Sequence, residues 1–86
     1  MRKSLKTDEI NIDSPAIYRI RVQGIIPPDW SFRLNNMQIT ANSDGKKADE
    51  TLLVGKLNDQ AALTGVLNTL YNNQFPVLSV ECLEKL

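Results

Sequence analysis

Residues 53–83 read LVGKLNDQAALTGVLNTLYNNQFPVLSVECL, and this stretch decides the fold. An apolar run is followed by Asn58 and Asp59, two residues that favour the start of a helix. Their side-chain oxygens can accept hydrogen bonds from backbone N–H groups that the first turn leaves unpaired. After Pro76 the chain returns to apolar and β-branched residues. The stretch therefore predicts a strand, a capped helix and a second strand.

The predicted helix carries one apolar stripe. Apolar residues recur at spacings of three and four, which places them on one side of a helix; they are Leu63, Val66, Leu67 and Leu70, flanked by Ala62 and Tyr71. Asn72 and Asn73 can end the helix, and Pro76 prevents it from resuming. In the last strand we expect Leu78, Val80 and Cys82 to face the core, opposite Ser79 and Glu81.

Three further elements are predicted upstream. AIYRIRVQG, residues 16–24, alternates as a half-buried strand does, with Tyr18, Ile20 and Val22 on one side. IIPPDWSFRLNN, residues 25–36, has room for a helical turn around Asp29–Leu34, which would bring Trp30 and Leu34 together over the core. MQITAN (37–42) and the strand Thr51–Leu57 form a β-hairpin across a polar connection that contains Asp44 and Gly45.

The element order favours an α+β fold. A helix between the third and fourth strands packs its stripe on one face of an antiparallel four-stranded sheet. With a short first helical turn, this is the small ferredoxin-like β(α)ββαβ arrangement. We expect residues 1–15 to be a flexible N-terminal tail and residues 16–86 to form a single domain.

Composition narrows the function. The 86 residues include ten basic and ten acidic side chains, so a partner recognised through a charge surplus, such as nucleic acid, is disfavoured. No apolar run is long enough for a membrane span, no signal peptide is evident, and the single Cys82 cannot form an internal disulfide. We therefore expect a cytoplasmic protein. The chain lacks histidine, and we expect no metal, cofactor or catalytic residue.

The sheet face away from the helix is the first candidate for function. We expect it to carry Arg19, Arg21, Gln23, Gln38, Thr40, Ser79 and Glu81. Of these, Arg19, Arg21, Gln38 and Glu81 are the candidate interaction residues. The structural alternative is that an antiparallel sheet often leaves one face in water.

Other residues carry weaker signals. Trp30 and Phe32, next to two prolines, could anchor a peptide or a partner subunit, or the tryptophan could simply close the core. Asp59 and Gln60 are candidate ligand contacts, although a helix cap explains Asp59. Cys82 is expected to be a small buried hydrophobic residue and not a nucleophile.

Several segments together resemble a known family. They are YRIRVQG, Trp30, LNNMQIT, TLLVGKLNDQAALTGVLNTL and PVLSVE, which span Tyr18 to Glu81. This pattern is similar to that of a family of short uncharacterised bacterial proteins, including cyanobacterial ones. The resemblance supports the boundaries of the fold and implies no activity, cofactor or catalytic residue.

Three functional hypotheses remain. The first is a small non-catalytic interaction or adaptor module that acts through self-association, as a homodimer, or through protein contacts. The second is a regulatory small-ligand sensor, because residues 53–81 are similar to the strand–helix–strand part of amino-acid-binding ACT domains. The third is a small enzyme, which is the weakest because no residues combine into a catalytic pattern.

Overall fold

The computed structural model describes residues 14–42 and 49–86. The predicted tail, apart from its last two residues, and the Asp44–Gly45 connection lie outside this part of the chain. The elements are β1 (Ala16–Gln23), the 3-10 helix η1 (Pro28–Leu34), β2 (Gln38–Asn42), β3 (Glu50–Leu57), α1 (Gln60–Asn72) and β4 (Val77–Lys85).

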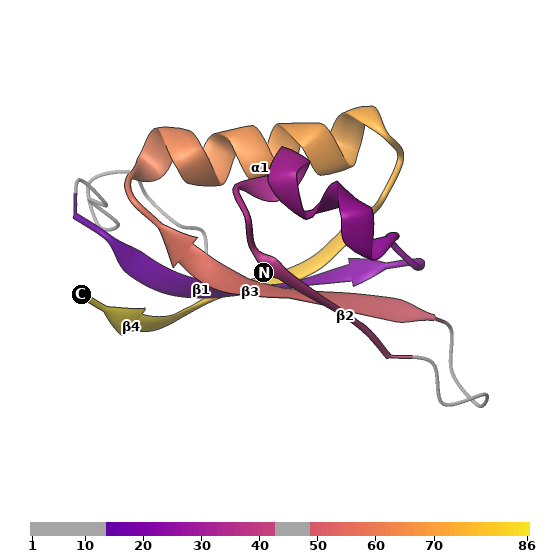
Figure 1. The fold of residues 1–86 in the computed structure, drawn as a ribbon, viewed down its shortest axis with the longest axis horizontal. Coiled ribbons are helices and arrows are strands. Elements are labelled where there is room, and N and C mark those ends of the chain that lie inside the picture. Colours follow the sequence, from indigo (N-terminus) through magenta and orange to yellow (C-terminus); the bar gives the residue numbers. More distant parts are fainter. Residues whose placement is uncertain (1–13, 43–48) are drawn as a thin grey trace.

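The strands form one sheet in the order β2-β3-β1-β4, and every neighbouring pair is antiparallel. Both α1 and η1 lie on the same side of this sheet (Figure 1). The alternation in β1 buries Tyr18, Ile20 and Val22 beneath them. The predicted antiparallel sheet with one main helix is therefore confirmed.

The helix α1 starts and ends where its sequence predicts. The Oδ1 atom of Asp59 accepts a hydrogen bond from the Ala62 N–H at 2.9 Å, so Asp59 is the N-cap. The last helical residue is Asn72, and Asn73 is the C-cap. Along the predicted stripe, the buried residues are Leu63, Val66 and Leu70, while Leu67 is partly buried.

The helix η1 closes the core beside α1. Leu34 is fully buried, and Trp30 packs against the core with its ring edge-on to Phe75 at 5.5 Å between centroids. The Thr51 hydroxyl donates to the Gly24 carbonyl at 2.6 Å and accepts from the Ile26 N–H at 3.1 Å. This buried threonine thus fixes the turn that leads from β1 to η1, where Gly24 adopts a φ of 101°.

The strand β4 corrects two predictions. Its pairing with β1 shifts register between Arg21 and Val22, so that Ser79 opposes Arg21 while Val77 opposes Val22. Leu78 is the extra residue of this bulge, and the prediction that it faces the core is wrong, because Val77 takes that place. Cys82 is exposed, not buried, since residues 81–86 at the sheet edge are all exposed.

Candidate functional site

The face of the sheet opposite α1 and η1 is the main candidate site, and we call it the open face. Strand register arranges its side chains in rows across the sheet, from β4 to β2. One row contains Glu81, Arg19, Val54 and Gln38, and the next contains Ser79, Arg21, Leu52 and Thr40. A third row, on the other side of the first, contains Glu84, Ile17 and Lys56. Within the described ranges, 14–42 and 49–86, no helix covers these rows.

Two ion pairs hold the arginines of the open face in place. Arg21 meets Glu50 in a fork, with Nη2 to Oε2 at 2.9 Å and Nε to Oε1 at 3.4 Å. The hydrogen bond to Glu50, aided by the charge of the carboxylate, raises the pKa of the Arg21 guanidinium above its ordinary value. Arg19 places Nη2 at 2.6 Å and Nε at 2.8 Å from a single oxygen of Glu81. Each guanidinium group is therefore held beside one carboxylate, of Glu81 for Arg19 and of Glu50 for Arg21.

Apolar residues lie between these ion pairs. Ile17, Leu52 and Val54 are partly buried and project from β1 and β3 on the open face. The alternation in β1, β2 and β4 had predicted only polar residues on this face, so these three apolar residues were not expected there. The signal was the run Leu52-Leu53-Val54, because three consecutive apolar residues in a strand place apolar side chains on both of its faces. The open face is therefore amphipathic.

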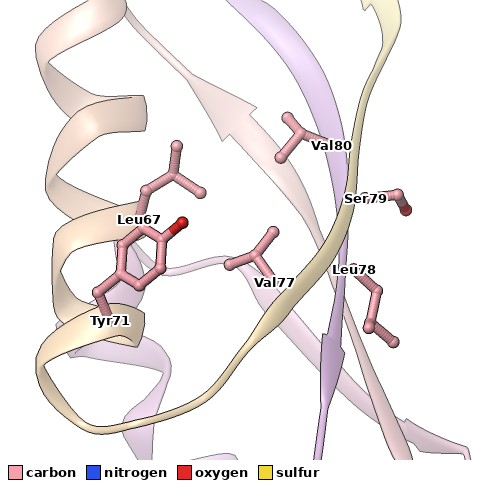
Figure 2. A pocket seen from close by; sticks show the side chains of 6 residues that line it. All are labelled: Leu67, Tyr71, Val77, Leu78, Ser79 and Val80. Atoms are coloured by element: carbon pink, nitrogen blue, oxygen red, sulfur yellow. The ribbon is translucent and has the colours of Figure 1, made fainter. Parts of the chain in front are cut away.

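A shallow groove runs between α1 and β4 on the covered side of the sheet. It has a volume of about 260 Å³, and Figure 2 shows Leu67, Tyr71, Val77 and Val80 around it, while Leu78 and Ser79 point away from the helix. A second hollow, of about 280 Å³, lies where Phe32 of η1 meets Gly65 and Thr69 of α1. Both volumes fall just below the range of roughly 300–1,000 Å³ that is common for small-molecule pockets.

The structure brings together some of the predicted site residues and separates others. Arg19, Gln38 and Glu81 lie in one row of the open face, and Arg21 lies in the next. Trp30 is partly buried against the core, whereas Phe32 is 74% exposed beside the second hollow, so the two aromatic residues have different surroundings.

The two candidate ligand contacts lie at the start of α1. Asp59 is used as the helix cap, and Gln60 is the exposed first residue of the helix. The side chain of Asp59 therefore has a structural partner in the Ala62 N–H.

The described part of the chain has neither a metal-binding group of side chains nor a membrane-spanning helix. It contains no group of three or more His, Cys, Asp or Glu side chains placed to hold a metal ion. None of its helices has the length and apolar character needed to cross a bilayer.

Comparison with known proteins gives one match. No curated protein and no solved structure matches the chain significantly. A family model described as "Domain of unknown function (DUF8691)" matches residues 17–81, which include every strand and helix apart from the first residue of β1 and the last four of β4. The chain therefore belongs to the DUF8691 family.

Proposed function

We propose that the chain is a small non-catalytic interaction module that acts through contact with a second copy of itself. The observation that carries this proposal is the open face, which α1 and η1 leave uncovered although it bears Ile17, Leu52 and Val54. These three side chains are partly buried, and apolar side chains that are left partly accessible on one surface and rimmed by polar ones are typical of protein interaction sites.

The chemistry of the open face suits a protein partner better than a small ligand. The surface is an open sheet face, and its charged groups already neutralise each other in the Arg19–Glu81 and Arg21–Glu50 pairs. A small charged ligand would have to displace one of these partners. A protein surface can instead cover the apolar residues and leave both pairs intact, and arginine is enriched at such interfaces.

The size of the chain points the same way. A domain of 86 residues buries a smaller fraction of its surface on folding than a larger domain does. Covering a partly apolar sheet face with a second copy would supply additional apolar burial. Self-association is therefore a physically reasonable role for this face.

The proposal also includes a ferredoxin-like fold, a bacterial origin and a cytoplasmic location. The strand order β2-β3-β1-β4, with both helical elements on one side, supports the ferredoxin-like arrangement. The resemblance of YRIRVQG and the following segments to short bacterial proteins supports a bacterial origin, and the single cysteine agrees with the reducing conditions of the cytoplasm.

Light scattering coupled to size-exclusion chromatography tests self-association. We expect the measured mass to rise from that of a 9.7 kDa monomer towards twice this value as the protein concentration increases. A mass that stays at the monomer value up to the highest soluble concentration would count against self-association.

The two other hypotheses lack a comparable observation. For the ligand sensor, Asp59 already accepts the hydrogen bond from Ala62, and both hollows are small and open. A thermal-shift screen with the twenty amino acids tests it, because a ligand at 100 times its dissociation constant adds about 2.7 kcal/mol to the free energy of unfolding. The hypothesis of a small enzyme rests on no arrangement of residues described above.

A further inference from the structure

We infer that the open face binds a second copy of the chain face to face, about a two-fold axis that runs close to the strand direction. This inference rests on the proposed self-association and adds its surface and its orientation. The choice of a second copy as the partner follows from the distribution of charge in the two central rows of the face, because only one of the two simple orientations keeps their like charges apart.

Within the two central rows of the open face, one half is charged and the other half is neutral, whereas the rows on either side of them place Lys56 and Glu50 on β3. The strands β4 and β1 contribute Glu81, Arg19 and Arg21 to these rows, together with Ser79. The strands β3 and β2 contribute Val54, Leu52, Gln38 and Thr40. Charges in the central rows therefore lie on one side of the boundary between β1 and β3.

A two-fold axis along this boundary places the half formed by β4 and β1 of each copy over the half formed by β3 and β2 of the other copy. The strand β1 then lies over β3 of the other copy, so that the stems of Arg19 and Arg21 cover Val54 and Leu52. The strand β4 lies over β2 of the other copy, where the Glu81 carboxylate meets the Gln38 amide. Aligned sheets cross at about 30°, which leaves this matching of rows in place near the axis.

The alternative axis, in the same plane but perpendicular to the strands, is unfavourable. It would place β1 of one copy over β1 of the other, so that Arg19 and Arg21 of the two copies would face each other. Like charges that face each other in an interface oppose association. In the favoured orientation Arg19 and Arg21 each keep their own carboxylate, while Lys56 of the third row lies over Ile17 of the other copy.

The area of the open face limits the strength of the contact. Four strands spaced about 4.8 Å apart and three rows spaced about 6.8 Å apart give a face of roughly 400 Å² in plan. A typical stable interface buries about 800 Å² of accessible surface on each partner, which is about twice the area of this face, so the contact is expected to be small and weak. We therefore expect a reversible dimer whose population depends on protein concentration.

Charge substitutions at Gln38 test the orientation. Gln38 is exposed, and in the inferred dimer it faces Glu81 of the other copy. Because the dimer is symmetric, this contact occurs twice, once on each side of the axis. Gln38→Glu should weaken dimerisation about 3–30-fold and Gln38→Lys should tighten it by a similar factor, since each exposed ion pair is weak and there are two of them. Both effects should shrink in about 1 M salt, where screening is strong.

Matched controls carry the same charges on the other side of the molecule. Asn68→Glu and Asn68→Lys change an exposed residue of α1 and should leave the dimerisation constant unchanged. If both Gln38 variants weaken the dimer, Gln38 faces its own copy and the perpendicular axis holds. If neither variant has an effect, the dimer uses another surface, such as the groove between α1 and β4. Either result overturns the inference.

Cross-linking gives an independent test. In a Cys82→Ser background, one protein carries Gln38→Cys and a second, larger tagged protein carries Glu81→Cys. Each molecule then has a single cysteine, so every link joins two molecules. A short bismaleimide should link the two variants to each other far more efficiently than it links either variant to itself. A predominance of links between identical variants would contradict the inferred axis.

The outcomes separate this inference from the proposed function. A protein that is monomeric at every concentration contradicts self-association itself. If the protein dimerises, but the Gln38 substitutions do not change the dimerisation constant and no mixed cross-link forms, the proposed self-association stands. Only the inferred surface and axis are then overturned. A monomeric chain that dimerises once residues 1–13 are deleted would show that its own N-terminal residues occupy the face, which also overturns the inference.

Discussion

At the scale of single residues, Gly55 should tolerate substitution poorly, because a larger side chain has no space there. A Cβ atom at Gly55 would lie 3.1 Å from the Met37 Cα atom, which is backbone and cannot rotate away. We expect Gly55→Ala to lower the free energy of unfolding by about 1–3 kcal/mol through overpacking between β2 and β3. Gly65→Ala is the matched control. No atom lies within 4 Å of its Cβ position, so this change should stabilise the helix by about 0.5–1 kcal/mol. Urea denaturation of both variants measures the difference, and a neutral Gly55→Ala would contradict the close approach.

Residues also differ in how well their roles can be predicted from sequence. The cap at Asp59 was predictable because a cap depends on local sequence, and the structure confirms it. The exposure of Cys82 was not predictable in this way, because it depends on which strand lies at the edge of the sheet. Burial is a property of the assembled sheet, and the alternation within β4 does not contain that information.

At the scale of elements, α1 has a firmly held side and a loosely held side. Leu70 is 0% exposed in the core, whereas Leu67 is partly buried at the groove beside β4. Leu70→Ala should therefore cost about 2–5 kcal/mol of unfolding free energy, and Leu67→Ala about 1–2 kcal/mol. Thermal or urea denaturation at a concentration where the protein is monomeric gives both values. Equal losses would show that Leu67 is as tightly packed as Leu70.

The helix and the strands β1 and β2 were predictable at this scale because their apolar residues recur with a regular period, whereas β3 was predicted as the second strand of a hairpin. The N-terminal half of β4 was not predictable, because its bulge at Leu78 interrupts the alternation and β4 itself contains no glycine or proline to mark it. The same strand shows Val77 and Val80 on the side of α1, three residues apart (Figure 2). A strict period of two cannot place both residues on one face.

At the scale of the whole molecule, the candidate site is a product of register. The sequence predicted Arg19, Arg21, Gln38 and Glu81 on one face, because alternation alone assigns residues to faces. It could not predict that Glu81, Arg19, Val54 and Gln38 form a single row, since that depends on three separate strand pairings. The position of Glu81, Arg19 and Arg21 on one side of the two central rows, opposite neutral residues of β3 and β2, follows from these pairings.

The stability of the whole molecule should also depend on one buried phenol. Tyr18 is 4% exposed, and its burial, together with the nearby charge of the Cys82 thiolate, raises the pKa of the phenol above 10.0. The folded state therefore holds this proton more tightly than the unfolded state does. The resulting stabilisation is fully present below pH 10.0 and is lost as the pH rises through the folded pKa.

We expect the free energy of unfolding, measured by urea denaturation, to fall more steeply above pH 10.0 in the unmodified protein than in Tyr18→Phe. Tyr71, which is 67% exposed, is the matched control, so Tyr71→Phe should keep the steep fall. Parallel curves for the unmodified protein and Tyr18→Phe above this pH would mean that the phenolate of Tyr18 is as well solvated in the folded chain as in the unfolded one.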